Sequence, residues 1–326
     1  MTTVVGIDVG GTKVAAARLA DEGIVEPCQH PTELSSTQAL IEQLVKVVDE
    51  ARGGARIDAV GIGVPSIVEF ATGRVLFSAN IPLAGVPLRQ VLGERLGVPV
   101  FVDNDATVAA LAEAHDEQLK LVSPNLVMLT IGTGVGGGIV FGGRIFRGAT
   151  GGAGELGHTL IGLPLGAPLD DVPAAGPDFP QPGSLESFAS GTALDHLVTA
   201  IVTGHPDSEL GRRAAAGEQV LGADVVAACR NGDQPAAAAV RHWAHAIGIG
   251  IANAVNTFDP GEVVIGGGAA AAGDLLLGPA REIAEGYIMP GLRGHLNVRF
   301  ARFGARAGVL GASLLAVHEF RDSEAK

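Results

Sequence analysis

Hydrophobic residues in the first third of the chain alternate between strand-like runs and helix-like spacing. Residues 3–9 are an apolar, β-rich run, residues 10–13 a glycine turn, and residues 14–19 a second apolar run without helix caps, which predicts a β-hairpin. The elements predicted next are a helix at 37–52, a strand at 59–64, a helix at 88–96, a strand in VPVFVDND and a helix at 106–115. This alternation is typical of an α/β sheet whose faces are covered by helices.

The rest of the chain opens with the same hairpin pattern and then becomes mainly helical. Strands are predicted at 126–131 and 139–141 around a seven-residue glycine-rich turn, and the proline-rich residues 163–184 predict a long loop. The later elements are helices at 186–203, 222–230 and 234–256, a strand at 262–265, a glycine turn at 266–268, a helix at 273–285 and a last, amphipathic helix at 307–320. We expect the last helix to pack back on the N-terminal part of the chain.

Length and composition indicate two folded lobes. A chain of 326 residues exceeds one ordinary core, so we expect a small α/β lobe at 1–117, completed by the C-terminal helix at 305–326, and a larger lobe at 118–304. An apolar content of 47% excludes a disordered chain. A net charge of -13 argues against nucleic acid as a partner, because phosphate backbones are bound by basic surfaces.

The chain carries no pattern of a secreted or membrane protein. Cys28 and Cys229 are the only cysteines, and they lie far apart in no disulfide, metal or redox spacing. The N-terminus leads directly into a strand, so we expect no signal peptide. Residues 121–143 are uncharged, but proline and several glycines interrupt them, which argues against a membrane span. We therefore expect a soluble, cytoplasmic protein with no membrane partner.

The first candidate site is DVGGTK, a strand that ends in a carboxylate and a tight turn. Gly10 and Gly11 allow backbone N–H groups to approach a phosphate, and the hydroxyl of Thr12 adds a donor. Asp8 is suited to hold Mg²⁺ through water. The order differs from a Walker A loop, because Thr12 precedes Lys13 and a strand, not a helix, follows. A plain hairpin turn is the alternative.

The second candidate is the glycine-rich turn GTGVGGG at 132–138. Gly132, Gly134 and Gly137 match the dinucleotide fingerprint G-x-G-x-x-G, but that fingerprint requires a helix where this chain continues as IVFGG. A hairpin whose N–H groups and Thr133 hydroxyl point at a phosphate is the better interpretation. Two hairpins of one design in successive lobes predict paired phosphate clamps across a cleft.

The third candidate, VDNDA, ends a strand and starts a helix. The Asp105 carboxylate at this position can accept a proton from an alcohol, and Asn104 can donate and accept hydrogen bonds to neighbouring hydroxyls. Ordinary helix capping is the alternative for either residue, since Asp and Asn are favoured N-caps. The sequence assigns no role to Asp103.

The fourth candidate combines ELGH with a carboxylate beyond the proline-rich loop. Glu155 and His158 are spaced to share one helical face and, with Glu186, could bind several hydroxyls of a sugar. Buried carboxylates without charge partners would require such a ligand. For His158 alone, a structural role is the alternative.

The fifth candidate is VVIGGG, a strand that runs into glycines before a helix. Gly266, Gly268 and Ala271 fit G-x-G-x-x-A, but no acidic residue for a ribose follows in the next strand-like segment, NVRFARF. A turn that contacts adenosine and simple packing of helix on strand are the two remaining interpretations.

Together these motifs resemble the ROK family of sugar kinases. DVGGTK, NDA, GTGVGGG, ELGH, LESFASG and the glycines after Ile265 follow one another in the family's order and spacing, so the resemblance covers nearly the whole chain. It implies an actin-like (ribonuclease H-like) two-domain α/β fold, with ATP and a sugar in the interdomain cleft. It also implies an ATP-dependent phosphotransferase.

The resemblance also implies roles for individual residues. Asp105 matches the catalytic base. The sugar hydroxyls would be bound by Asn80, Asn104, Asp105, Glu155, His158 and Glu186. ATP and its phosphates would be contacted by Asp8, Gly10, Gly11, Thr12, Lys13, Thr133, Gly134 and Gly267, with Mg²⁺ held at Asp8. A homodimer is likewise implied.

One departure from the family concerns zinc. Many members carry C-x-C-G-x-x-G-C after the ELGH-type histidine, whereas this chain has Ser184 where the last cysteine would stand and no cysteine nearby. We therefore expect no structural zinc and a loop at 163–184 held by other contacts.

Several alternatives remain open on the sequence. Glucose is the first choice of sugar, with mannose, fructose, N-acetylmannosamine and N-acetylglucosamine as alternatives and polyphosphate as an alternative donor. Repressors of the same family carry an N-terminal helix-turn-helix, whereas this sequence starts at the strand before DVGGTK, so we do not expect a DNA-binding role. A protein-binding actin-like ATPase would not require the hydroxyl-binding residues.

Overall fold

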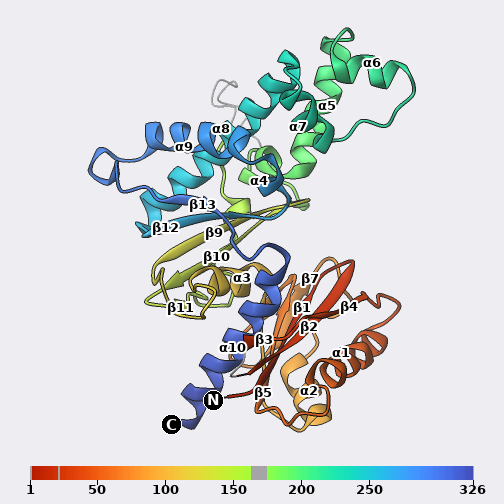
Figure 1. Ribbon diagram of the computed structural model, residues 1–326, viewed down its shortest axis with the longest axis vertical. Helices are drawn as coiled ribbons and strands as arrows, with labels where there is room; N and C mark the ends of the chain where they lie inside the picture. Colours follow the sequence, from red (N-terminus) through yellow and green to blue (C-terminus); the bar gives the residue numbers. More distant parts are fainter. Residues whose placement is uncertain (1, 21–22, 163–174, 326) are drawn as a thin grey trace. The chain divides into compact units, whose positions relative to one another are not determined.

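The computed structural model describes residues 2–20, 23–162 and 175–325 (Figure 1). These residues form two compact units, one of residues 1–128, 138–154 and 302–326 and one of residues 129–137 and 155–301. Part of the expected loop, 163–174, lies outside the described residues. Within the described part of the chain, no helix is both long and apolar enough to cross a membrane.

A mixed sheet forms the centre of the first unit. Its strands are β1 (Val4–Val9), β2 (Lys13–Ala20), β3 (Gly23–Ile24), β4 (Cys28–Pro31), β5 (Ala59–Val64) and β8 (Val100–Asn104). They run in the order β3-β2-β1-β5-β8, and β4 also pairs with β2. β1 and β2 are antiparallel, which confirms the predicted hairpin, whereas β1, β5 and β8 are parallel.

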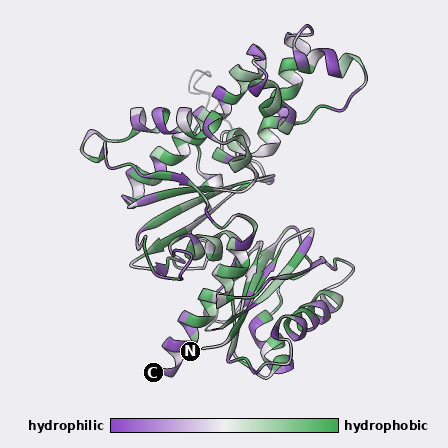
Figure 2. Ribbon diagram, viewed as in Figure 1, coloured by the Kyte–Doolittle hydropathy of each residue, from purple (hydrophilic) through white to green (hydrophobic). Residues whose placement is uncertain are grey.

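Helices cover this sheet. They are α1 (Thr37–Arg52), α2 (Leu88–Leu96), α3 (Asp105–Glu113) and α10 (Ala307–Glu324), the last preceded by the 3₁₀ helix η4 (Gly304–Arg306). α1 has the predicted bounds because Ser36 caps its N-terminus, accepting a hydrogen bond from the Ala39 N–H, and Gly53 ends it in a left-handed conformation. Its hydrophobic and hydrophilic sides are distinct in Figure 2.

The last helix packs on the first unit, as predicted, but it is not amphipathic over its first half. Residues Ala307 to Ala316 are buried on every side of α10, because this part of the helix lies against β1, β5 and α3. The packing is close enough that a side chain at Gly61 would clash with the carbonyl of Ala312. A pattern that predicts one apolar face therefore underestimates how far this helix is enclosed.

The second sheet contains the second glycine hairpin. Its strands are β9 (Leu126–Ile131), β10 (Val135–Phe141), β11 (Arg144–Ile145), β12 (Glu262–Gly266) and β13 (Val298–Phe300), in the order β11-β10-β9-β12-β13. The predicted seven-residue turn is wrong, because β10 begins at Val135 and takes in three of the glycines. Glycine is needed in this strand, since a Cβ at Gly138 would lie 2.6 Å from the Ala106 carbonyl oxygen of α3.

The second unit is otherwise mainly helical. Its helices are η1 (Leu156–His158), α4 (Leu185–Ala189), α5 (Gly191–Gly204), α6 (Glu209–Ala215), α7 (Gly222–Arg230), α8 (Gln234–Phe258), η2 (Gly268–Ala272), α9 (Asp274–Tyr287) and η3 (Pro290–Leu292). The predicted continuous helix at 186–203 is wrong. Ser190 is extended, and its Oγ accepts a hydrogen bond from the Ala193 N–H at 3.1 Å, so one residue ends α4 and caps α5.

The pattern missed several short elements. The hairpin of β6 (Ser66–Glu69) and β7 (Arg74–Ser78) and the helix α6 lack a long hydrophobic period, so propensity alone does not separate them from loops.

The compact units differ from the lobes expected at 1–117 and 118–304. Residues 118–128 and 138–154 belong to the first unit, because β10 and β11 pair next to α3 and Arg147 binds Asp103. The expected lobes at 1–117 with 305–326 and at 118–304 stay a prediction.

Candidate active site

The carboxyl ends of the parallel strands bring three acidic residues to one edge of the first sheet. Asp8 of β1 is in register with Gly63 of β5, and Gly63 is in register with Asp103 of β8. Asp105 follows directly as the first residue of α3. This is the edge at which α/β sheets bind ligands, because side chains there are not covered by the next strand.

Asp8 and Asp105 form an electrostatically strained pair. Burial, with the Asp105 carboxylate nearby, raises the pKa of Asp8 to about 6, although Lys13 acts in the opposite direction. Burial also raises the pKa of Asp105. Asp8 lies against the first turn of α10, where a side chain at Gly308 would overlap its carboxyl group. Two neighbouring carboxyl groups of this kind fit a divalent cation with oxygen ligands, which would relieve their repulsion.

Asn104 acts as a helix cap. Its Oδ1 accepts a hydrogen bond from the Thr107 N–H at 3.0 Å, and its amide donates to the Ser66 carbonyl at 3.4 Å. Oδ1 of Asp105 accepts a hydrogen bond from the Ala106 N–H at 2.8 Å. The capping interpretation is therefore observed for Asn104, and capping holds the Asp105 carboxyl group in a fixed position at the helix start. A role for Asn104 at sugar hydroxyls stays a prediction.

Asp103 belongs to a buried ion-pair network. It is 1% exposed and accepts hydrogen bonds from Arg147 Nε at 2.7 Å and from the Asn104 N–H at 3.0 Å. Arg147 also bonds Glu319 of α10 at 2.9 Å, and its guanidinium lies 3.4 Å from the centre of the Phe70 ring. Sequence reasoning missed Arg147, because nothing local links residues 44 positions apart. The network supports the segment that carries Asp105.

The first glycine turn is closed by its own backbone and held by β4. The Gly10 N–H donates to the Lys13 carbonyl at 2.8 Å, and Thr32 donates through its hydroxyl to Gly10 O at 2.6 Å and through its N–H to Thr12 O at 3.0 Å. Thr12 and Lys13 are exposed. Thr32 was also missed by sequence reasoning, for the same reason as Arg147.

Asn80 lies beside this turn. Its Cβ would be 3.6 Å from a Cβ built on Gly11, and the Asn80 side chain is exposed. The first unit therefore brings together the candidate residues that sequence reasoning placed in it, which are Asp8, Gly10, Gly11, Thr12, Lys13, Asn80, Asn104 and Asp105.

In the second unit, the turn after β9 is held by the junction of α4 and α5. The Gly191 N–H donates to Gly132 O at 2.7 Å, and the Thr192 hydroxyl donates to Thr133 O at 2.8 Å. Glu186 Oε2 accepts a hydrogen bond from the Val135 N–H at 2.6 Å.

The position of Glu186 explains one glycine of the motif. A side chain at Gly134 would clash with the Glu186 carboxylate. This backbone N–H is a hydrogen-bond donor and not a charge partner, so the predicted role of Glu186 at sugar hydroxyls stays a prediction.

Glu155 and His158 lie together, but not on an α-helical face. Glu155 is the N-cap and His158 the last residue of one turn of 3₁₀ helix, in which side chains three residues apart are eclipsed. His158 Nε2 is 3.7 Å from Glu155 Oε2. The Glu155 side chain is 45% exposed, so it is not a buried carboxylate, and its role at sugar hydroxyls stays a prediction. Nδ1 of His158 is buried without a hydrogen-bond partner among the described residues, and the Phe179 ring meets the imidazole edge-on at 5.1 Å between centres.

Protein contacts hold the described end of the proline-rich loop. The Gln181 side chain donates to the carbonyls of Gly176 and Asp178, at 2.6 and 2.8 Å. Ser184, which stands where relatives of the zinc-binding type have a cysteine, caps α4 through a hydrogen bond from the Ser187 N–H at 3.3 Å. These contacts hold residues 175–184, and the absence of a structural zinc stays a prediction.

Gly267 has a conformational and a packing requirement. Its φ is +80°, and a side chain there would clash with the Ile131 carbonyl. The segment that follows is the 3₁₀ helix η2, so the helix that a dinucleotide fingerprint requires does not begin at these glycines. Close packing is thus observed, and contact with adenosine stays a prediction.

Comparison with known proteins places this geometry in a family. Residues 4–319 match the ROK family. A glucokinase of Halalkalibacterium halodurans is 36% identical over 331 residues, which cover 98% of this chain and 96% of that protein.

Solved structures agree. A ROK family glucokinase from Streptomyces griseus, in complex with glucose and AMPPNP, has a TM-score of 0.77 at 30% identity, covering 97% of this chain and 99% of its own. A ROK hexokinase from Thermus thermophilus has a TM-score of 0.77 at 34% identity, covering 98% of this chain and 100% of its own.

The two sheets, with a glycine turn in each unit and an acidic edge in the first, therefore define an actin-like two-domain α/β protein. The chain belongs to the ROK family.

Proposed function

We propose that this protein is an ATP-dependent kinase that transfers a phosphoryl group to a hexose, with glucose as the first choice and glucose 6-phosphate as the product. The observation that carries the proposal is the Asp105 carboxyl group, which begins α3 at the carboxyl edge of the sheet next to Asp8. The glycine turn Gly10–Lys13 follows Asp8 directly on the same sheet. The similarity to glucokinases over nearly the whole chain supports the same activity.

In the proposed mechanism Asp105 is the general base. Its carboxylate accepts the proton of one sugar hydroxyl, whose oxygen bonds to the γ-phosphorus of ATP as the bond from that phosphorus to ADP breaks. The raised pKa of Asp105 makes its carboxylate a stronger proton acceptor than an ordinary aspartate. Backbone N–H groups of the two glycine turns would bind the phosphates, with the hydroxyls of Thr12 and Thr133 as further donors.

Asp8 is the proposed holder of Mg²⁺. A bound Mg²⁺ would neutralise charge that develops on the transferred phosphoryl group. The raised pKa of Asp8 fits this role, because a cation would stabilise the ionised form that burial disfavours.

The sugar is proposed to contact two groups of side chains. Asn80 and Asn104 would bind hydroxyls from the first unit, and Glu155, His158 and Glu186 from the second. The unpartnered Nδ1 of His158 supports this assignment, because a buried ring nitrogen is usually hydrogen-bonded. Gly267 would contact adenosine. We further propose that the enzyme is a cytoplasmic homodimer that supplies glycolysis.

A coupled ADP-release assay tests the proposal. Mg-ATP is presented with glucose, mannose, fructose, N-acetylmannosamine and N-acetylglucosamine, and polyphosphate replaces ATP in a parallel series with direct detection of the sugar phosphate. Asp105→Asn is assayed beside Asp49→Asn, which removes the same charge from an exposed carboxylate of α1. Turnover with one sugar that Asp105→Asn abolishes and Asp49→Asn retains supports the kinase. No turnover by a folded, ATP-binding protein would instead indicate a sugar-sensing regulator or a protein-binding ATPase.

A further inference from the structure

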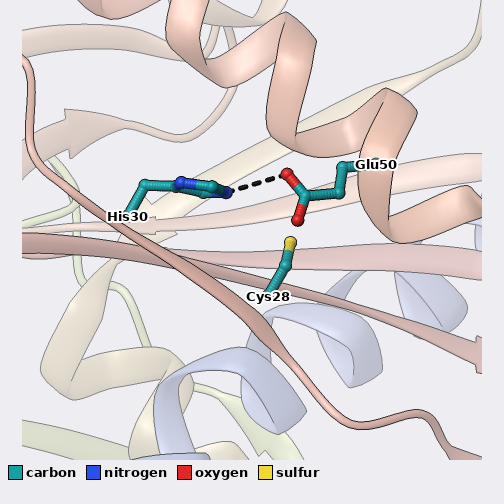
Figure 3. A group of neighbouring side chains, drawn as sticks. All are labelled: Cys28, His30 and Glu50. Carbon is teal, nitrogen blue, oxygen red and sulfur yellow. Dashed lines mark hydrogen bonds and ion pairs between the residues drawn. The ribbon is translucent and has the colours of Figure 1, made fainter.

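Three side chains of the first unit converge at the edge of its sheet. Cys28 and His30 project from β4, and Glu50 projects from α1 (Figure 3). Cys28 and His30 are two residues apart on an extended strand, so they share one face of the sheet. One sulfur, one imidazole nitrogen and one carboxylate oxygen lie within 4.8 Å of one another. Sequence reasoning found no metal spacing for Cys28, because the third side chain, Glu50, is 22 positions further along the chain.

The donor atoms are those of a borderline-soft divalent cation. Zinc is bound in proteins by cysteine sulfur, histidine nitrogen and carboxylate oxygen, and a three-ligand set leaves a fourth position for water. Hard cations such as Mg²⁺ and Ca²⁺ prefer oxygen ligands alone. Ligand atoms around a tetrahedral zinc lie about 3.5 Å apart, given bonds of about 2.0–2.3 Å. Closing the present arrangement around zinc therefore needs shifts of about 1 Å in side chains, not in the backbone.

The surroundings favour such a closure. β4 and α1 are already joined, because the Gln43 side chain of α1 donates to the Pro31 carbonyl at 2.7 Å, so binding would order little additional chain. A cavity of about 520 Å³ is lined by His30 and Glu50, and it gives an entry path and room for a water ligand. Two further carboxylates, Glu33 and Glu42, line the cavity together with Lys46, the only cation among its lining residues.

Two of the three groups bind each other, and the third contacts the backbone. His30 Nε2 lies 2.8 Å from Glu50 Oε2, and the Cys28 thiol contacts the carbonyl oxygen of Ala16 at 3.4 Å. Burial, with the Glu50 carboxylate nearby, raises the pKa of the Cys28 thiol, so metal binding would have to displace its proton. A metal cation would have to replace the contact between His30 and Glu50.

We propose that Cys28, His30 and Glu50 bind one Zn²⁺ ion, with water in the fourth position. The site differs from the zinc motif of the family, which this chain lacks near His158. The ion would bridge β4 to α1 two residues before Thr32, whose hydroxyl and N–H hold the Gly10–Lys13 turn. If the proposed kinase function holds, zinc occupancy would thereby stiffen the turn that binds ATP phosphates and lower the KM for ATP.

Cobalt titration tests the site directly. Co²⁺ is added to the metal-free, full-length protein, and the near-ultraviolet thiolate-to-cobalt charge-transfer band is followed. We expect one equivalent to produce the band in the wild type and Zn²⁺ to displace it. Cys28→Ser should abolish the band, whereas Cys229→Ser, which changes a cysteine of α7 in the other unit, should retain it. His30→Ala and Glu50→Gln should each weaken Zn²⁺ binding by about tenfold or more.

The outcomes separate the metal site from the kinase proposal. Absence of the band in the wild type, its persistence in Cys28→Ser, or its loss in Cys229→Ser would overturn the site. Binding to the folded state alone is expected to raise Tm with Zn²⁺ in wild type and Cys229→Ser, less in Glu50→Gln, and not in Cys28→Ser. The KM for ATP is then compared for desalted metal-free and zinc-loaded protein. A cobalt band in a protein without kinase activity would leave the metal site standing and refute only the proposed function.

Discussion

The Arg147–Asp103 pair offers the sharpest test of how the fold supports Asp105. Arg147→Met removes the guanidinium but keeps much of the apolar volume. Among the described residues, Asp103, which is 1% exposed, would then keep the Asn104 N–H as its one hydrogen-bond donor. Removing one partner of a buried pair costs about 3–5 kcal/mol, because an uncompensated charge stays buried. Arg147 is 20% exposed, so water screens part of the effect and we expect about 3 kcal/mol.

The stability lost in Arg147→Met should depend on pH, because the loss comes from the ionised Asp103 carboxylate. Burial already raises the pKa of Asp103 in the wild type, and Arg147 acts to lower it. Without Arg147 the pKa in the folded state rises further above that of the unfolded chain. Below the pKa that Asp103 has in the unfolded chain, the carboxyl is protonated in both states and the variant keeps this part of its stability. As pH rises through the pKa of Asp103 in the folded state, the buried carboxyl must ionise and that stability is lost. The difference between Arg147→Met and wild type should therefore be largest near neutral pH and shrink under acidic conditions.

Urea unfolding at neutral and acidic pH measures both effects, with Arg144→Met as the matched control. Arg144 also pairs with an aspartate, Asp322, but its side chain is 66% exposed, so this substitution should cost less than about 1 kcal/mol. The double variant Asp103→Asn/Arg147→Met should be more stable than Arg147→Met alone, since no charge is left unpaired. Equal losses in Arg147→Met and Arg144→Met, or no recovery in the double variant, would refute this reasoning.

Three further predictions concern the proposed chemistry. Asp105→Asn should lower kcat for the sugar at least about 100-fold with a smaller change in KM, and steady-state kinetics would contradict the assigned base if kcat persisted. Gly134→Ala should raise the KM for ATP several-fold, because the new methyl group clashes with Glu186. In the control Gly132→Ala the methyl group enters open space and should have little effect on this KM. Equal KM values for the two variants would argue against a role for this turn. In the absence of Mg²⁺, the free energy of unfolding of the wild type should fall as pH rises from about 4 through about 6, since the pKa of Asp8 is raised. Urea unfolding of Asp8→Asn over the same pH range should show a clearly smaller fall. An unchanged dependence of the unfolding free energy on pH would show that Asp8 is not its cause.

Local patterns predicted the long elements well. α1, β5 and α2 have the bounds expected from their hydrophobic spacing, because caps and glycines at their ends act within a few residues. The break at Ser190 was not predicted, since hydrophobic positions continue across it and a serine inside such a pattern does not by itself indicate a cap.

The candidate site was predicted in parts. The sequence placed Asp8, the first glycine turn and Asp105 at strand ends, and parallel pairing then brought them to one edge. It could not show that Glu186 is bonded to the Val135 N–H or that Glu155 is exposed. Those properties depend on partners that lie far away along the chain, and sequence spacing carries no information about them.

The sequence by itself determined the class of fold, the family resemblance and the identity of the chemically capable residues, because periodicity, turns and motifs are local properties. Only the tertiary structure decided which of these groups are charged, paired or accessible. Arg147 reaches Asp103 across 44 residues, and Cys28, His30 and Glu50 meet only where β4 lies beside α1. Ionisation and metal binding depend on distance and burial in space, and folding sets both.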